Sequence, residues 1–417
     1  MKIKTYIYSM IAIAFIGGCG SVDNPPSTQM DGGELVVDLD GKFIKKSLLD
    51  NHVAGITEDT VVYGQKAYKI PYVTIDEEGN EVNASGYMVV PTGLPQELIA
   101  LKGLSVVSDD HGTIFNNNEA LSVIASTTNS PSGASIILTS LAGFVTLEPD
   151  YIGFGDSVGH YHPFVMKKSL ANATVDFIKA AREFAKNNDI NLNDQLFLTG
   201  YSEGGYAALA TLQKIEQEHI DMPVTLATPM AGPYDLNLTA FGVLAQPTLV
   251  EPSFMADVAY AYAKAYDREY DEIINEPYAS RLPTLFDGSK YMEEIDAELT
   301  DITTGEDGLF SPVFVYDFVN NPDNWFRKAM VENSLHRWAP QTSIRLIQCR
   351  GDEVIPYQMS EWTKANLDAY GGVDIQVIPV EDALGIPVEV QHSACGVLAY
   401  SLTSQIFATI RQSTIGY

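Results

Sequence analysis

Residues 195–205 read Gln-Leu-Phe-Leu-Thr-Gly-Tyr-Ser-Glu-Gly-Gly, a short apolar run that leads into a Gly-x-Ser-x-Gly pattern centred on Ser202. The run predicts a β-strand, and the Ala- and Leu-rich segment from Tyr206 to about Glu218 predicts a helix. A serine on the tight turn between a strand and a helix exposes its hydroxyl, and flanking glycines let the two elements approach closely. We therefore predict that Ser202 is a nucleophile.

The same pattern occurs a second time, in residues 155–159 around Ser157. A Gly-rich loop precedes Ser157, and residues 160–163 (His-Tyr-His-Pro) follow it and cannot start a regular helix. Ser157 therefore lacks both flanking elements and is not expected to be the nucleophile. The alternative for Ser202 is that its pattern forms a tight turn without chemistry.

Strand-like and helix-like segments alternate along most of the chain. Strands are expected at residues 67–75, 81–91, 104–108, 144–147, 195–199, 224–229, 343–348 and 373–377, and helices at 169–186, 206–218, 360–369 and 396–411. This alternation predicts an α/β fold, with a mostly parallel sheet and helices on both faces. The first two strands are expected to form an antiparallel hairpin at the edge of the sheet.

The stretch at residues 237–333 interrupts this alternation. It is rich in Tyr, Glu and Asp, with helical patches and several Pro and Gly interruptions. We predict a helical cap or lid inserted between a first core segment, 34–236, and a second, 334–417; a second independent domain is the alternative. The tyrosines between Tyr260 and Tyr270 are expected in the core of this cap rather than on an aromatic wall facing a substrate.

A serine hydroxyl needs a base to accept its proton and an acid to orient that base. After a nucleophile of this kind, the acid and then the histidine follow along the chain. His392 is the one of seven histidines that satisfies this order, and Asp352 follows the strand expected at 343–348. Glu353 is the alternative acid.

Two further acids, Glu381 and Asp382, lie after the last expected strand and are less favoured. The oxyanion of the reaction needs two backbone N–H donors. We expect one from Glu203, the residue after the nucleophile, and the other from Thr113 or Gly112, in the loop after residues 104–108.

Six short motifs follow one another in order along the chain. They are Asp109-Asp110-His111-Gly112-Thr113, residues 149–157 (Pro-Asp-Tyr-Ile-Gly-Phe-Gly-Asp-Ser), His162-Pro163-Phe164, residues 200–205, Ala231-Gly232-Pro233-Tyr234-Asp235 and Gly351-Asp352. Together they resemble the secretory lipase branch of the α/β-hydrolases, which also shades into bacterial exported esterases and peptidases. The resemblance spans about residues 60–410.

The resemblance implies an α/β-hydrolase core, a helical cap between the strands near 229 and 343, and ester hydrolysis without a cofactor. It also implies that Ser202, Asp352 and His392 form the catalytic triad and that residues 111–113 form the oxyanion segment. Independently of the resemblance, we expect His111 to hold this loop rather than to take part in the chemistry. The long acidic insertion and the N-terminal segment described below depart from the family pattern, which leaves substrate size and lid behaviour open.

Two cysteines flank the acid and the base. Cys349 lies three residues before Asp352, and Cys395 lies three residues after His392. Because the acid and the base must meet, their loops can bring the two sulfurs within bridging distance. We predict a disulfide that braces the acid–base pair; two buried free thiols are the alternative.

The N-terminus has the features of an export signal. Two lysines, a short apolar run and Gly17-Gly18-Cys19 make residues 1–18 a signal peptide, and the sequence before Cys19 resembles a bacterial lipobox, in which the cysteine is acylated. A plain signal peptide is the alternative. Residues 19–33 are polar and predict a flexible tether. We expect an exported lipoprotein anchored at the outer membrane or cell surface.

The amino-acid composition and the absence of certain motifs exclude several classes of ligand. The 417 residues are 46% hydrophobic, which suffices for a large core, and 54 acidic against 25 basic residues give a net charge of −29. Such a charge repels phosphate backbones and excludes nucleic acid as a partner. His160 and His162 lack a third ligand at motif spacing, and no dinucleotide or phosphate-loop motif occurs, so neither metal nor cofactor is expected.

These observations predict a serine hydrolase that cleaves carboxylic esters through an acyl-enzyme intermediate, with a small-molecule or lipid ester as substrate. One alternative is a peptidase of the same fold that releases short N-terminal peptides and holds the substrate amine with an acidic residue. Another is a non-catalytic surface binding protein on a hydrolase scaffold. The sequence leaves the oligomeric state open.

Overall fold

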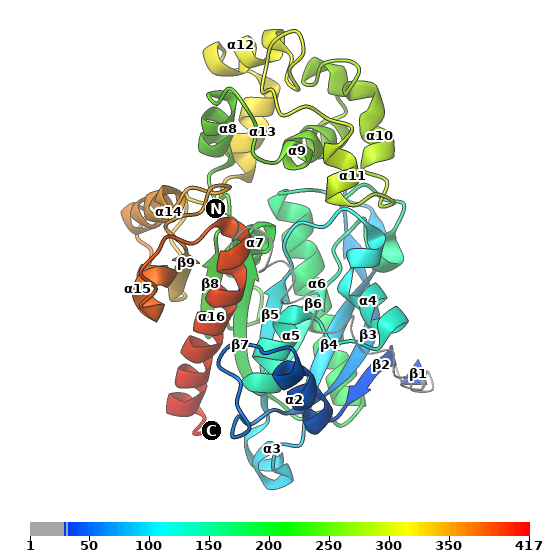
Figure 1. The fold of residues 1–417 in the computed structure, drawn as a ribbon, viewed down its shortest axis with the longest axis vertical. Helices are drawn as coiled ribbons and strands as arrows, with labels where there is room; N and C mark the ends of the chain where they lie inside the picture. Colours follow the sequence, from blue (N-terminus) through cyan, green and yellow to red (C-terminus); the bar gives the residue numbers. More distant parts are fainter. Residues whose placement is uncertain (1–28, 31) are drawn as a thin grey trace.

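The computed structural model describes residues 29–30 and 32–417, and these residues build one ten-stranded mixed sheet (Figure 1). In chain order its strands are β1 Gln29–Met30, β2 Gly33–Leu39, β3 Gly64–Ile75, β4 Glu81–Thr92, β5 Leu104–Asp110, β6 Val145–Pro149, β7 Leu192–Tyr201, β8 Leu226–Met230, β9 Ile344–Gln348 and β10 Ile375–Pro379. In space the order is β1-β2-β3-β4-β6-β5-β7-β8-β9-β10.

Strands β1 to β4 pair antiparallel, and β4 pairs antiparallel with β6. From β6 through β10 all neighbours are parallel. The mostly parallel α/β sheet is therefore confirmed, and the predicted hairpin is β3 and β4. Two further strands, β1 and β2, extend the sheet beyond that hairpin.

Helices flank the sheet and fill the chain between β8 and β9. The helices around the sheet are α2 Gly41–Asp50, α3 Gln96–Lys102, α4 Leu121–Thr128, α5 Gly133–Ser135, α6 Lys167–Asn187, α7 Glu203–Gln217, α14 Gln358–Ala369, α15 Val380–Leu384 and α16 His392–Thr414. Those between β8 and β9 are α8 Leu236–Leu244, α9 Pro252–Ala265, α10 Leu282–Leu285, α11 Met292–Asp296, α12 Pro312–Asn320 and α13 Trp325–Asn333.

The central strand β7 shows how the sheet is buried on both faces. Leu196 and Leu198 pack in the large core that includes α6 and α7. Phe197, between them, points the other way and packs against Phe144 and against Phe407 of α16. Alternate residues of one strand therefore fill two separate cores, which explains why this segment reads as a continuous apolar run.

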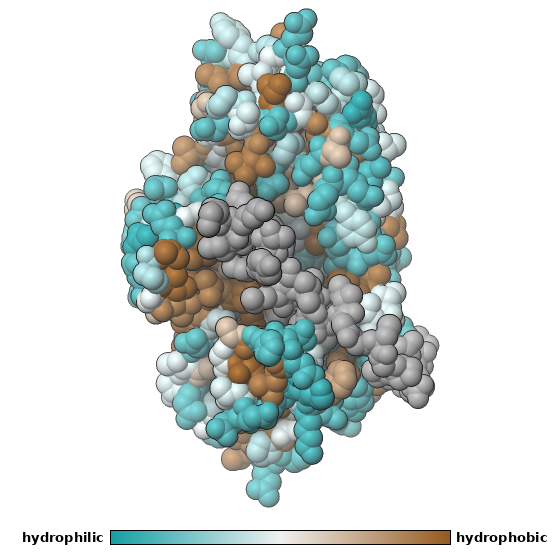
Figure 2. Space-filling model, in the orientation of Figure 1, coloured by the Kyte–Doolittle hydropathy of each residue, from teal (hydrophilic) through white to brown (hydrophobic). Residues whose placement is uncertain are grey.

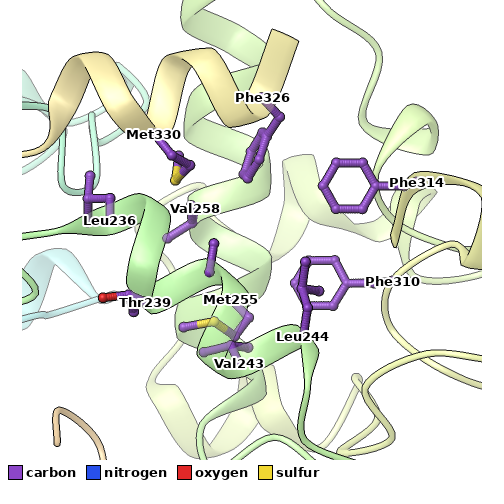
Figure 3. A pocket seen from close by; sticks show the side chains of 11 residues that line it. Leu236, Thr239, Val243, Leu244, Met255, Val258, Phe310, Phe314, Phe326 and Met330 are labelled. Atoms are coloured by element: carbon purple, nitrogen blue, oxygen red, sulfur yellow. The ribbon is translucent and has the colours of Figure 1, made fainter. Parts of the chain in front are cut away.

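Helices α8 to α13 lie together beyond one end of the sheet, at the top of Figure 1. Tyr260 and Tyr262 of α9 are buried there, as expected for the core of this helical region. Figure 3 shows side chains of α8, α9 and α13, together with Phe310 and Phe314, around a small apolar cavity of about 50 Å³. This region therefore has its own apolar interior.

Apolar side chains also reach the surface. Figure 2 shows hydrophobic residues (brown) on the helical region as well as on the rest of the molecule. On α12, Val313 and Tyr316 are 78% and 72% exposed.

Most element boundaries differ from the sequence predictions by a few residues, and two of the differences concern the predicted tether and the catalytic histidine. The tether was expected to extend through residue 33, but Gln29 and Met30 pair with Glu34 and Gly33 as short strands. The final helix begins at His392, four residues before its predicted start, because Glu353 accepts a hydrogen bond from the first helical N–H. The signal peptide, Cys19 and the lipobox lie outside the described residues.

Candidate active site

Ser202 occupies the turn between β7 and α7. Its backbone has φ 60° and ψ −120°, a conformation that L-residues rarely adopt, and its N–H donates to the carbonyl oxygen of Met230. A Cβ atom on Gly204 would lie 1.8 Å from the carbonyl oxygen of Asp110, and one on Gly205 would lie 2.2 Å from that of Met230. The glycines are therefore required by the close approach of neighbouring strands to the start of the helix.

Ser202, His392 and Asp352 are brought together although up to 190 residues separate them in sequence. Nε2 of His392 lies 3.0 Å from Oγ of Ser202, and Nδ1 of His392 lies 2.8 Å from Oδ2 of Asp352. In this order of contacts, a neutral imidazole donates from Nδ1 to the carboxylate and presents Nε2 to accept the serine proton. The geometry can therefore generate a serine nucleophile.

The Asp352 carboxylate is oriented by the loop that follows β9. Its Oδ1 accepts hydrogen bonds from the backbone N–H groups of Val354 and Ile355, at 3.1 and 2.8 Å. Its Oδ2 also accepts from Nε2 of Gln348, at 3.3 Å, and its side chain is fully buried. These donors hold the carboxylate in place with Oδ2 facing His392.

His392 is the first residue of α16 and is held on several sides. Oε2 of Glu353 accepts from its backbone N–H, and the hydroxyl of Tyr201 donates to its carbonyl oxygen at 2.7 Å. The rings of Tyr201 and His392 lie 5.0 Å apart. The alternative acid Glu353 thus contacts the backbone of the base and not its ring.

A disulfide joins Cys349 and Cys395, whose Cα atoms are 6.0 Å apart. Cys349 directly follows β9, and Cys395 lies in the first turn of α16. The bond therefore ties the loop that carries Asp352 to the helix that carries His392. Neither cysteine is accessible to solvent.

The loop after β5 lies against the nucleophile turn. A Cβ atom on Gly112 would be 3.2 Å from the carbonyl oxygen of Tyr201 and 3.9 Å from Cβ of Ser202. The ring nitrogens of His111 lie 2.8 Å from the carbonyl oxygen of Gly112 and 3.3 Å from that of Asp150. His111 thus contacts the backbone of this loop, and Thr113 follows Gly112, half-buried.

The competing candidates are engaged elsewhere. Ser157 is 1% exposed, and its hydroxyl lies 2.7 Å from the carbonyl oxygen of Phe154 in a short 3₁₀ turn. Glu381 accepts from the N–H groups of Arg350 and Val390, at 2.9 and 3.0 Å. Among residues 29–30 and 32–417, no group of three or more His, Cys, Asp or Glu side chains is placed to hold a metal ion.

Two cavities adjoin these residues. The larger, about 800 Å³, lies between α8, α9 and the loop after β9, and its wall is mostly apolar, with Val243, Phe254 and Met255 among its residues together with Glu353. The smaller, about 300 Å³, is lined by Gly112, by Tyr201 and by residues of α16 such as Ser393. Each cavity is therefore lined by residues next to the serine–histidine pair: Glu353, which contacts His392, in the larger, and Tyr201 and Ser393 in the smaller.

Sequence reasoning missed one buried polar group beside the site. His162 contacts the side chain of Glu203 at 2.8 Å, and Asp257 of α9 lies near both. His162 lies in one of the family motifs, but its contact with Glu203 joins residues 41 positions apart, and no local sequence pattern predicts such a contact.

The fold and the arrangement around Ser202 define an α/β-hydrolase. The profile of the Secretory lipase family matches residues 124–384, which is more than half of the chain. The chain belongs to the secretory lipase family. No sequence among the curated proteins is significantly similar to it.

Solved structures with the same fold include two bacterial proteins. A proposed hydrolase from Legionella pneumophila is similar with a TM-score of 0.80 and 23% sequence identity, over 93% of this chain and 99% of that one. The rice cell wall degrading esterase LipA from Xanthomonas oryzae is similar with a TM-score of 0.73 and 22% identity, over 94% and 98% of the two chains.

A fungal structure extends the comparison. Lipase A from Candida antarctica in its closed state has a TM-score of 0.57 and 15% identity, over 84% of this chain and 77% of that one. Membership of the secretory lipase family supports hydrolysis of esters and export from the cell.

Proposed function

We propose that the protein is an exported serine hydrolase that cleaves carboxylic esters through a Ser202–His392–Asp352 triad. Ser202 attacks the ester carbonyl, and His392 accepts the serine proton at Nε2 and returns it to the leaving alcohol. Water then releases the acyl group by the same steps in reverse. The observation that carries this proposal is the unbroken contact from Oγ of Ser202 through the His392 ring to the buried Asp352.

The negative charge on the tetrahedral intermediate requires donors that are already in place. Glu203 is the first residue of α7, so its N–H has no acceptor within the helix, and the positive end of the helix dipole lies there. We propose this N–H as one donor and the N–H of Thr113, or of Gly112, as the second. The position of Gly112 beside Ser202 supports the assignment.

Residues 237–333 would form a cap over this site. Phe254 and Met255 of α9 line the cavity of about 800 Å³, and Glu353, which also lines it, contacts His392. A mostly apolar cavity of this size can remove the hydrocarbon part of an ester from water. We therefore propose a neutral ester with a substantial apolar group as the substrate.

We also propose that acylation of Cys19 anchors the exported chain to a membrane. The disulfide between Cys349 and Cys395 supports a location outside the cytoplasm, because cysteine thiols stay reduced in the cytoplasm of most cells. Metabolic labelling with radioactive palmitate should mark the wild-type chain, and the Cys19→Ala chain should stay unlabelled. Equal labelling of both chains would remove the anchor from the proposal.

Hydrolysis of nitrophenyl esters from acetate to palmitate, measured beside aminoacyl-nitroanilides, tests the function. We expect ester turnover by the soluble chain and its loss in Ser202→Ala. The best acyl length separates a small-ester esterase from a lipase. Anilide turnover without ester turnover would favour a peptidase, and turnover that survives in Ser202→Ala would refute the triad.

A further inference from the structure

A buried, hydrogen-bonded pair of ionisable side chains adjoins the proposed oxyanion donor. Nε2 of His162 lies 2.8 Å from Oε1 of Glu203, and its Nδ1 lies 2.9 Å from the carbonyl oxygen of Ile152. Both ring nitrogens face acceptors, which favours the doubly protonated imidazolium. Burial lowers the pKa of His162, but the Glu203 carboxylate and its hydrogen bond raise it, and the net pKa lies above its ordinary value.

Helix α9 of the cap rests on the segment that carries His162. The ring of Phe254 lies 6.2 Å from that of Phe164, and the hydroxyl of Tyr262 donates to the carbonyl oxygen of Val165 at 3.0 Å. Asp257 lies one helical turn after Phe254 and is 3% exposed. The cap therefore places a buried carboxyl group near His162.

Asp257 is held neutral at physiological pH. Burial raises its pKa, His162 lowers it, and Glu203 raises it, with the result at about 8. A neutral carboxyl group can lie near the buried pair of His162 and Glu203 without adding charge.

We propose that Asp257 and His162 are positioning residues that connect helix α9 of the cap to Glu203. Through this connection they hold the Glu203 backbone N–H in the position where it can donate to the oxyanion. The link rests on the proposed function, because it deepens the role assigned to that N–H. Oε2 of Glu203 has no hydrogen-bond partner among the described residues, so His162 is the side chain that fixes this carboxylate. A loose carboxylate one residue after Ser202 would allow the donor to shift, and preorganised donors lose their effect when they move.

The charge balance of this region makes the link sensitive to pH. The other ionisable groups that face Glu203 are Asp110 of β5, Tyr151 and Tyr206, each with a pKa raised first of all by burial. Tyr260 faces Asp257 from one turn further along α9. His162 and Glu203 are hydrogen-bonded in this region, and ionisation of Asp257, whose pKa is about 8, adds a buried negative charge near them.

The first test compares the pH profile of ester kcat/KM in the wild type and in Asp257→Asn. In the wild type we expect activity to fall about fivefold or more on an alkaline limb with an apparent pKa near 8, as Asp257 ionises. Asn has the same shape and cannot ionise, so the variant should lose this limb. Identical alkaline limbs in the two proteins would overturn the proposal.

A matched control is Asp307→Asn, which removes an exposed carboxylate of the cap that does not face His162. We expect its profile to follow the wild type. If Asp307→Asn also abolished the alkaline limb, the effect would come from the net charge of the cap, and the link would be refuted.

The second test replaces His162 by Gln, which can still donate one hydrogen bond to Glu203 but carries no charge. We expect kcat to fall about 10- to 100-fold with KM nearly unchanged, because removal of a whole oxyanion donor costs on the order of 10²- to 10³-fold. A change in KM alone, or a kcat within about twofold of the wild type, would overturn the proposal.

A third measurement needs no catalysis and keeps the proposal testable if His162→Gln fails to fold. The pKa of Asp257 is raised on folding, so the wild-type melting temperature should fall as pH rises from about 4 to 8. Asp257→Asn should show a smaller slope, and equal slopes would contradict the link. Activity that persists in Ser202→Ala would refute the proposed function instead, so the two failures are distinguishable.

Discussion

Oε2 of Glu353 lies 2.9 Å from the backbone nitrogen of His392, while the adjacent carboxylate of Asp352 lies 2.8 Å from the His392 ring. Two neighbouring acids therefore contact the same histidine in different ways. Glu353 caps the helix that begins at His392, and Asp352 contacts the ring nitrogen that determines the tautomer. Substitution of Asp352 should therefore affect mainly catalysis, and substitution of Glu353 should affect mainly stability.

Asp352→Asn should lower kcat on the order of 10³- to 10⁴-fold, because an amide cannot stabilise the imidazolium and favours the wrong tautomer. Glu353→Ala should lower kcat less and reduce stability by about 1 kcal/mol through loss of the cap. Steady-state kinetics and urea unfolding measure both effects. Glu353→Gln keeps an oxygen that can accept from the His392 N–H, so this variant should retain most of the kcat and stability that Glu353→Ala loses. A larger loss of kcat in Glu353→Ala than in Asp352→Asn would reverse the assignment.

Ser157→Ala should leave ester hydrolysis within about twofold of the wild type, since the Ser157 hydroxyl is buried within hydrogen-bond distance of the carbonyl oxygens of Tyr151 and Phe154. It should cost about 1 kcal/mol of stability, because the N–H of Gly153 loses its buried acceptor. Thermal unfolding and the ester assay check this prediction. Loss of activity in a folded Ser157→Ala protein would show that the first pattern also contributes to catalysis.

Removal of the disulfide should reduce both stability and activity. The double variant Cys349→Ala/Cys395→Ala should be about 2–4 kcal/mol less stable, because the bond closes a loop that contains both Asp352 and His392. A mass gain of two hydrogens on reduction verifies the bond itself. If kcat and unfolding of the double variant matched the wild type, the disulfide would have no bracing role.

The buried carboxyl group of Asp109 leads to a separate prediction, on how stability depends on pH. Burial raises its pKa to about 7, and a hydrogen bond from Tyr400 opposes that shift. Because the folded state holds this proton more tightly than the unfolded state, stability should decrease as pH rises from about 4 to 7. Asp109→Asn should flatten this dependence in melting curves recorded across that range. An unchanged slope would mean that Asp109 is already ionised when folded.

The sequence predicts those parts of the structure that depend on local pattern. The strand and helix around Ser202, the alternating elements and the two cysteines beside Asp352 and His392 all carry short-range signals. The role of Glu353 as a helix cap carries none, because a cap between distant segments depends on tertiary packing. The strands β1 and β2 lie partly in a segment whose polar composition favours a tether.

The group formed by His162, Glu203 and Asp257 is the clearest case of a feature beyond sequence reasoning. Its members come from a loop, from α7 and from the cap, and the cap has an irregular pattern that predicts helices without predicting where they pack. Charged residues are abundant between residues 251 and 307, so the sequence alone does not single out Asp257. The structure does, because Asp257 is buried in the cap and lies near His162 and Glu203.

Covalent labelling with a fluorophosphonate tests the central claim most directly, because the reagent reports an activated serine without any assumption about the substrate. The folded wild-type chain should gain one adduct, which peptide mapping places on Ser202. Ser157→Ala should label like the wild type, and Ser202→Ala should stay unlabelled. An adduct on another residue, or failure of the folded wild-type chain to react, would contradict the account.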